Sequence, residues 1–438
     1  MAAIDKDILR LALPALGALI AEPIFLLTDT AMVGHLGAGA LGSLAIASTI
    51  LQTVLGLMIF LAYATTPRVA KRMGSGDRAG AITAGFDGIW LALCTSVLLI
   101  IIGLPLLNTA IAAFGPEPEI AAGAYSYLAI SWWGLPFMLT VIAATGLLRG
   151  LQDTKTPLIV AAAGCIANIG LNALFIYGLD MGVAGSAMGT VIAQAGMCTI
   201  YIIISVRAAK RLHASVRPDW SGVFSSAKTS GWLLVRNISL RAALIILVFI
   251  ATSMGTTELA AIQVAQSIFF ALALALDSLA IAGQAMIGLE LGAKNTEAVA
   301  AINRRLCLWG IVFGIVVGII LFAGSGIIPR AFSTDPEVLS ALTALLPVLA
   351  VSLPIAGYVF VLDGVLMGAE DARYLALAQL VAVIGYAILL VPVAQMWPGA
   401  PGLWAAFCIG FVSFRALTLG WRVRNRAWID RAVEKGIS

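Results

Sequence analysis

The chain has 438 residues, of which 61% are hydrophobic and only 11% are charged. Soluble domains carry about 25% charged residues, so this composition excludes a soluble globular protein and predicts an all-α polytopic membrane protein. The sequence has two histidines and no HExxH, GxSxG or P-loop pattern, which weighs against an intramembrane protease, an esterase and an ATPase. Loops that face anionic lipid headgroups explain the net charge of +4 without nucleic acid.

Hydropathy predicts twelve membrane-spanning helices, each about 20 residues or longer, as a bilayer requires. Their abundant Gly and Ala suit close helix packing in lipid. The predicted limits are 10–34, 41–66, 80–105, 120–146, 157–178, 182–206, 229–254, 259–284, 303–326, 338–364, 375–396 and 402–421.

The basic residues alternate between successive loops. Lys and Arg gather before the first span, after the even-numbered spans and in the tail, whereas loops 35–40, 178–182 and 396–402 hold almost none. Arg330 is the clear exception. By the positive-inside rule, this alternation predicts that both termini are cytoplasmic.

The second half of the chain repeats the first at an offset of 218 residues. Residues 113–119 reappear as 331–337, and residues 146–153 reappear as 364–371. Six spans in each half predict a parallel repeat about an axis along the membrane normal. We therefore predict two six-helix lobes in a single chain, and we expect a monomer. The predicted parts are an N-terminal lobe with a cation or proton site (1–206), a cytoplasmic linker (207–228), a C-terminal lobe (229–421) and a basic cytoplasmic tail (422–438).

Asp29 lies deep inside the first apolar span. An ionised carboxylate near the middle of a bilayer costs about 2.5 kcal/mol or more, so Asp29 is predicted to exchange a proton or an ion, or to bind a cationic ligand. The alternatives are an aspartate near the membrane interface and a helix cap. The repeat places Leu247 at the equivalent position, so the fold shared by the halves does not require a carboxylate there.

Five further polar residues could share a cavity with Asp29. Glu22 lies two turns earlier on the same helical face, as a second carboxylate or an interfacial side chain. Asn168 and Asn172 share one face of the fifth span, and Thr190 and Gln194 share one face of the sixth. Such pairs supply donors and oxygens to a carboxylate, a water or a cation; alternatively, they join packed helices.

Two prolines, Pro14 and Pro23, interrupt the first span. Proline removes a backbone hydrogen bond and bends helices. Since this span also carries the deep carboxylate, a moving helix and a static kink are both open interpretations.

The second half contains its own group of charged residues inside predicted spans. Separated charges there would be costly, so we expect a buried ion-pair cluster that acts as a structural latch, with substrate contact as the alternative. The residues of this cluster are Arg236, Arg241, Asp277, Asp363 and Arg415.

Taken in order, these motifs resemble the multidrug and toxic compound extrusion (MATE) family, and in particular its DinF branch. No single motif is decisive, but together they follow the whole chain. The residues that carry the resemblance are Pro23, Asp29, Thr30, Val33, Gly34, His35 and Leu36; Gly146, Leu148, Arg149, Gly150, Asp153 and Thr154; Asn168, Gly178, Gly182, Gly185 and Thr190; and Arg236, Arg241, Leu276, Asp277, Leu362, Asp363, Gly364 and Arg415.

The resemblance implies a V-shaped pair of lobes that exports amphipathic, often cationic, compounds in exchange for H⁺ or Na⁺. It implies a bacterial inner (plasma) membrane protein with no cofactor and no enzymatic activity. Asp29 would be the coupling group, with Asn168, Asn172 and Thr190 as neighbours. Many relatives have Asp at the position of Asn172, and this departure favours H⁺. DinF relatives often have Glu at the position of Gln284, which puts an acid-based substrate role for the eighth span in doubt.

In the cycle we expect, protonation from outside neutralises Asp29, the first span bends and cargo leaves; the proton is then released to the cytoplasm. Three alternatives stay open: a lipid-linked precursor flippase, an organic-anion exporter and an intramembrane enzyme. The enzyme lacks a recognisable nucleophile or metal motif. An anion exporter would be favoured if Arg236 and Arg241 faced the cavity, whereas pairing of Arg241 with Asp277 or Asp363 would leave no free cationic site.

Overall fold

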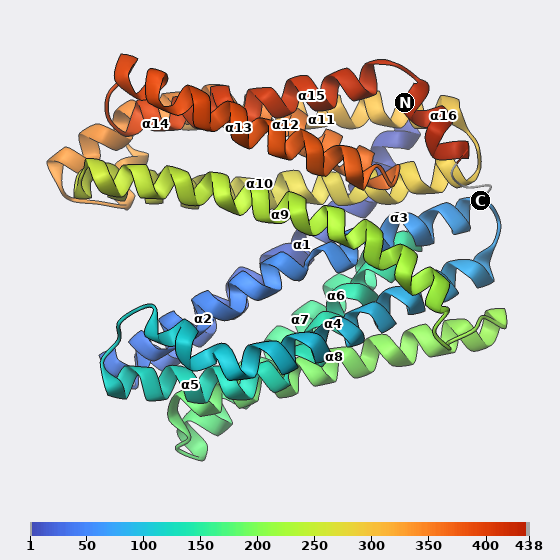
Figure 1. Ribbon diagram of the computed structural model, residues 1–438, viewed down its shortest axis with the longest axis horizontal. Helices are drawn as coiled ribbons and strands as arrows, with labels where there is room; N and C mark the ends of the chain where they lie inside the picture. Colours follow the sequence, from blue (N-terminus) through green and yellow to red (C-terminus); the bar gives the residue numbers. More distant parts are fainter. Residues whose placement is uncertain (1, 435–438) are drawn as a thin grey trace. The chain divides into compact units, whose positions relative to one another are not determined.

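The computed structural model of the protein describes residues 2–434, and every regular element in this range is helical (Figure 1). The helices of the first half are α1 (Ala2–Gly34), α2 (Ala38–Met58), α3 (Phe60–Gly74), α4 (Arg78–Ala112), α5 (Pro118–Trp133), α6 (Leu135–Gly150), α7 (Lys155–Asn172), the π-helical η1 (Ala173–Gly178) and α8 (Gly182–Leu212). Those of the second half are α9 (Trp220–Met254), α10 (Thr256–Gly292), α11 (Thr296–Ala323), the 3₁₀ turn η2 (Ile328–Ala331), α12 (Pro336–Gly368), α13 (Ala372–Met396), α14 (Ala400–Ala406), the π-helical η3 (Phe407–Ser413), α15 (Phe414–Arg424) and α16 (Ala427–Glu434).

The predicted membrane spans are confirmed. Eleven helices of the described chain are long and apolar enough to cross a membrane, and the pair α5 and α6, bent by 52°, makes a twelfth span if it is counted as one. Helices α2 and α3 together form the span Ala38–Gly74. The protein is therefore an all-α, multi-pass membrane protein.

The chain forms two compact units. We call residues 13–230 the first lobe, and residues 2–12 together with 231–434 the second lobe. The predicted linker 207–228 thus lies within the first lobe. In the predicted tail, α16 packs against α10 and α11 and buries Trp428 and Ile429. The functional division of the chain at the predicted domain limits stays a prediction.

The internal repeat extends to helix starts and turns. Helices α2, α4 and α5 begin 218 residues before α10, α11 and α12, respectively. Gly37 (φ 117°) and Gly255 (φ 140°) precede equivalent helices in a backbone conformation that glycine favours. Asp77 and Asn295 each accept a hydrogen bond from the backbone N–H three residues on, which caps α4 and α11 alike.

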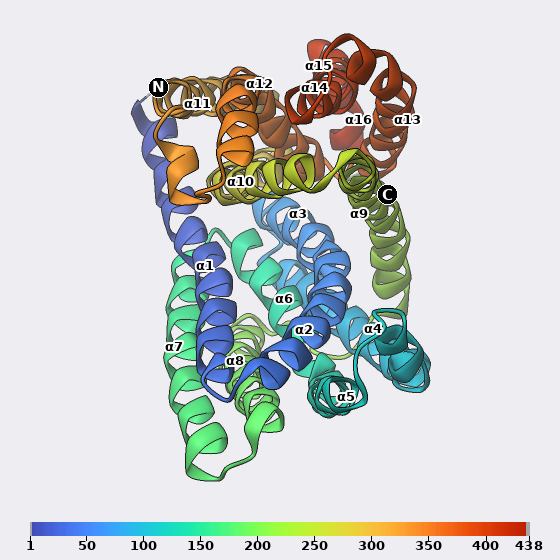
Figure 2. The same cartoon turned by 90° about the vertical axis from the view of Figure 1, so that its left-hand side faces the viewer.

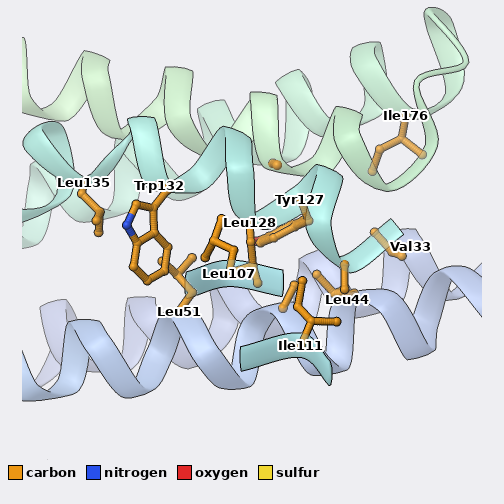
Figure 3. Packing of buried hydrophobic residues seen from close by; sticks show 13 residues of the cluster. Val33, Leu44, Leu51, Leu107, Ile111, Tyr127, Leu128, Trp132, Leu135 and Ile176 are labelled. Carbon is orange, nitrogen blue, oxygen red and sulfur yellow. The ribbon is translucent and has the colours of Figure 1, made fainter. Parts of the chain in front are cut away.

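The two lobes differ in where their helices break. The first lobe interrupts its second span at Ile59 and its fourth at Gly134, whereas α10 and α12 of the second lobe run unbroken. In the first lobe, an apolar cluster joins α2, α4 and α5 (Figure 3). Trp132 within it donates its indole N–H to the carbonyl of Leu99 at 2.8 Å. Tyr127 and Val33 lie toward the other end of this cluster (Figure 3).

The second lobe has an aromatic core around its last span. Trp404, Tyr386 and Phe407 are its largest fully buried side chains. Phe407 lies 5.7 Å from Tyr386 and 5.6 Å from Trp404, measured between ring centroids. Such contacts add to the apolar area that each ring buries and hold the π-helical segment η3 against α13.

Candidate functional site

The first lobe buries the Asp29 carboxylate of α1 against α7 and α8. Asn172 Nδ2 donates to Asp29 Oδ1 at 2.5 Å, and the Thr190 hydroxyl donates to Asp29 Oδ2 at 3.2 Å. Asn168 Nδ2 donates to Thr190 Oγ1 at 3.1 Å and lies 3.4 Å from Asn172 Oδ1. All four side chains are buried, with Asp29 only 2% exposed. We call these four residues the Asp29 network.

Local helix geometry places the two asparagines together. One turn separates Asn168 from Asn172, so both amides project from the same face of α7 toward α8. The helix turns π-helical at the next residue, Ala173, a change that often marks functional segments. Figure 2 shows α7 running beside α1.

Gly189 allows α8 to approach this face of α7. A β-carbon at Gly189 would lie 2.1 Å from the side-chain oxygen of Asn172. Any larger residue would therefore displace the amide that binds Asp29. Sequence reasoning did not single out Gly189, because a glycine in a membrane helix gives no signal of its own.

The Asp29 network contains no positive charge. The carboxylate's hydrogen-bond partners within residues 2–434 are an amide and a hydroxyl. Burial without a counter-ion makes the ionised carboxylate costly, whereas the protonated acid needs only hydrogen bonds. The arrangement suits a group that gains and loses a proton, and the predicted role of these residues stays a prediction.

Two tyrosines that the sequence analysis missed adjoin the network. Tyr127 of α5 is 3% exposed and lies beside Thr190 and the charge of Asp29. Tyr177 of η1 donates its hydroxyl to the carbonyl of Met32 at 2.6 Å. That carbonyl lies in the last turn of α1, where backbone oxygens lack helical partners, so Tyr177 ties the end of α1 to η1.

The other predicted residues of this region lie differently. Glu22 is exposed and makes no hydrogen bond to the described residues, so the structure does not bring it into the network. Gln194 lies one turn beyond Thr190 and buries a side-chain oxygen that has no partner in the described chain. Pro14 and Pro23 both lie inside the single helix α1.

In the second lobe, three of the five predicted charges meet directly. Arg236 donates to Asp363 Oδ2 at 2.8 Å, and Arg415 donates to Asp363 Oδ1. This triad joins α9, α12 and α15, and its members are at most 8% exposed. Arg241 is exposed and pairs with no acid in residues 2–434, and Asp277 is half-buried.

Two further features limit the chemistry of the described chain. Within residues 2–434, no three His, Cys, Asp or Glu side chains are grouped as a metal site would require. Gln284, at the position where DinF relatives often have Glu, is 2% exposed and donates to the sulfur of Met367 at 2.9 Å.

Comparison with known proteins decides the family. Residues 14–174 and 233–393, together more than half of the chain, match the MatE family model. The chain belongs to the MatE family. Each matched segment falls in one half of the repeat. Members of this family are multidrug efflux transporters rather than enzymes, so the protein is a membrane transporter.

Individual relatives cover nearly the whole chain. Protein DETOXIFICATION 43 of Arabidopsis thaliana is 29% identical over 94% of this chain and 89% of its own length. DNA damage-inducible protein F of Escherichia coli (strain K12) is 29% identical over 97% of this chain and 94% of its own length. The bent form of the Vibrio cholerae MATE transporter VcmN superimposes with a TM-score of 0.88, at 18% identity, over 99% of this chain and 98% of that one. The fold is that of the MATE transporters.

Gly189→Ala is expected to impair transport while the matched change Gly196→Ala does not. The added methyl at position 189 would meet the Asn172 oxygen, whereas nothing lies within 4 Å of a β-carbon at Gly196 on the same helix. Overpacking of this kind costs about 1–3 kcal/mol. Efflux assays and thermal melting of both variants in detergent measure the effect. Equal transport by the two variants would show that the Asn172 position does not matter.

Asp363→Asn is expected to destabilise the second lobe. The change would leave two buried guanidinium groups without their shared carboxylate, and removing one partner of a buried ion pair costs about 3–5 kcal/mol. Asp180→Asn, which removes an exposed carboxylate in the first lobe, is the control. Thermal melting distinguishes them. Equal melting temperatures would contradict the latch, and lost transport at full stability would point to substrate contact.

Proposed function

We propose that this protein is a secondary active multidrug transporter that exports amphipathic, often cationic, organic compounds in exchange for H⁺, and that Asp29 is the coupling carboxylate. One observation supports this most strongly. Asp29 is buried among neutral partners in the first lobe, whereas its repeat equivalent in the second lobe is Leu247, which is 0% exposed. The carboxylate is therefore an addition to the shared fold that packing alone does not require.

Proton binding would change the direction of hydrogen bonds in the network. An ionised carboxylate only accepts, so Asn172 and Thr190 both donate to it. A protonated Asp29 donates from one oxygen. If it donates to Thr190, the threonine hydroxyl must turn its own hydrogen toward another acceptor, and Asn168, which now donates to Thr190, can accept it only if its amide turns over. Each protonation state thus has its own set of bonds between α1, α7 and α8.

These bonds control how firmly α1 is held. Polar contacts at Asp29 and at the carbonyl of Met32 join the end of α1 to α7 and η1. Pro23 lies between Pro14 and Asp29, where a missing backbone hydrogen bond eases bending. Weakening the Asp29 contacts on protonation would let this part of α1 bend and expel the cargo.

The donor arrangement favours H⁺ over Na⁺. Hard cations such as Na⁺ require several oxygen ligands. In the structure Asn172 turns its NH₂ group, not its oxygen, toward Asp29, and the network contains a single carboxylate. Na⁺ would need the amide to turn over, and it remains the alternative coupling ion.

The proposal also covers the membrane location, the topology and the oligomeric state of the protein. We place it in the bacterial inner membrane with both termini cytoplasmic, because the basic loops alternate as the positive-inside rule requires. A single chain carries both lobes, so we propose a monomer. The membrane spans are apolar with few polar groups, and such surroundings would suit amphipathic cargo.

A second candidate, an organic-anion exporter, is favoured by one observation. Arg241 is exposed on α9 and pairs with no acid among the described residues, so it leaves a cationic group available to an anion. Arg236, by contrast, is committed to Asp363. Transport of an organic anion that is lost in Arg241→Gln, with no transport of a cation, would favour this candidate.

The direct test is transport by the purified protein in proteoliposomes. An imposed pH gradient, with Na⁺ absent, should drive accumulation of a fluorescent lipophilic cation. Asp29→Asn should reduce this transport to the background of empty liposomes, because the amide cannot take up and release the proton. Asp180→Asn, which removes an exposed carboxylate of the same lobe, should transport like the wild type.

The other outcomes are equally informative. Transport that follows only a Na⁺ gradient and still vanishes in Asp29→Asn would keep the coupling residue and replace the ion. Proton-driven transport that survives in Asp29→Asn would contradict the proposal and place the coupling elsewhere, first at Glu22.

A further inference from the structure

We propose that Asp5, Arg305 and Trp309 form a positioning cluster for transport: they fix the start of α1 to the second lobe, so that a change at Asp29 in the first lobe is passed to the second. This inference rests on the proposed role of Asp29. It concerns residues that take no part in the Asp29 network.

Helix α1 is shared between the two lobes. Its residues 2–12 belong to the second lobe, and its residues 13–34, with Asp29, belong to the first. The division falls next to Pro14. Ile8, Leu11 and Ala12 repeat at helical spacing and are at most 4% exposed, so the start of α1 is packed rather than loosely attached.

Polar contacts fix this start to α11. Arg305 Nε donates to Asp5 Oδ1 at 2.5 Å, and Arg305 Nη2 donates to Asp5 Oδ2 at 2.6 Å. Trp309 Nε1 also donates to Asp5 Oδ1, at 2.9 Å. A bidentate arginine–carboxylate pair sets orientation as well as distance. The side chains are only 30% and 22% exposed, so the pair is partly shielded from solvent. We call this group the Asp5 anchor.

Helix α9, the repeat counterpart of α1, is shared in the opposite sense. Its residues 220–230 belong to the first lobe and its residues 231–254 to the second. The buried Asp87 of α4 accepts from the backbone N–H of Asp219 at 3.2 Å, directly before α9. Arg68 of α3 donates to the carbonyl of Gly222 at 3.0 Å and to the Ser225 hydroxyl at 2.5 Å. Each lobe thus holds the start of the helix that continues into the other lobe.

The start of α9 is suited to this contact. Hydrogen bonds, above all from the Ser221 hydroxyl, hold the pKa of Asp219 below its usual range, so this residue is ionised at the positive end of the helix dipole. The Asp87 carboxylate approaches so closely that a β-carbon at Gly222 would lie 2.3 Å from its oxygen.

The two contacts occupy equivalent places in the repeat. The offset of 218 that relates the halves takes residue 13 to 231, which are the two points where the shared helices change lobe. The same offset takes Asp87 to Arg305. One position of the fold therefore holds the incoming helix in both lobes, with an acid facing backbone N–H in the first lobe and a base facing a carboxylate in the second.

This geometry makes α1 a mechanical connection. Asp29 lies about 36 Å beyond Asp5 along the helix, at 1.5 Å per residue. Between them lie Pro14 and Pro23, which have no backbone N–H to donate to the preceding turn. When the Asp29 end moves, the prolines absorb part of the motion, and the Asp5 anchor transmits the rest to α11. Without the anchor, the start of α1 would keep its apolar packing but lose the contact that fixes its orientation against α11.

The experiment compares single variants with a charge reversal. Asp5→Asn and Arg305→Gln break the pair, and Asp5→Arg combined with Arg305→Asp rebuilds it with opposite signs. Asp7→Asn, an exposed acid two residues along the same helix, is the control. For each protein we would measure melting temperature, binding of tetraphenylphosphonium in detergent, and proton-driven transport and counterflow of the same cation in proteoliposomes.

We expect both single variants to bind the cation as the wild type does. Their proton-driven transport and counterflow should fall at least about tenfold, which corresponds to a loss of about 1.4 kcal/mol of coupling free energy. The charge reversal should restore most transport, and Asp7→Asn should not change it. Single variants that transport normally would overturn the proposal. Binding and melting temperature that fall in step with transport, without rescue by the reversal, would also overturn it, since that pattern belongs to a structural contact alone.

Failure of the proposed function would be distinguishable. Counterflow exchanges labelled for unlabelled cation without a proton gradient, so it tests the Asp5 anchor whichever ion drives transport. Wild-type counterflow that depends on Asp5 and Arg305, together with transport that does not need Asp29, would retain the anchor and reject Asp29 as the coupling group.

Discussion

The constraint on which the structure depends most is the burial of the Asp29 carboxylate inside a membrane-spanning helix. Among residues 2–434, the hydrogen-bond partners of Asp29 are an amide and a hydroxyl, and the second amide of α7 supports both. No basic side chain in the described part of the chain pairs with it, so the energy of this site changes with the protonation of a single group. That property is the physical basis of the proposed coupling, and it is produced by three helices, α1, α7 and α8.

The second lobe pairs its buried carboxylate with positive charges instead of neutral groups. Asp363 lies between Arg236 and Arg415, so its charge is compensated on both oxygens and it binds three helices together. One fold, used twice, thus contains a carboxylate with neutral hydrogen-bond partners and one that is paired with an arginine on each oxygen. We infer that the first lobe supplies the chemistry of transport and that the triad keeps the second lobe rigid enough to respond as a unit.

Much of the fold could be predicted from the sequence, because long apolar segments and an ungapped repeat constrain the helices strongly. The resemblance to the MATE family singled out Asp29, Asn168, Asn172 and Thr190, which the structure brings together. The breaks at Ile59 and Gly134 were not predicted, since both fall within apolar runs that the sequence analysis took as single spans. Contacts between distant parts of the chain, such as Asp5 with Arg305, have no local pattern and required the structure.

The central claim is that protonation of Asp29 and retention of cargo exclude each other, and proton release on cargo binding measures it most directly. Purified protein in weakly buffered detergent solution would be titrated with tetraphenylphosphonium while a pH-indicator dye reports released protons. We predict release from the wild type at a pH where Asp29 is protonated, and none from Asp29→Asn even at cation concentrations that saturate the binding of that variant. Equal release from the variant, or cation binding by the wild type without release at any pH, would contradict the account.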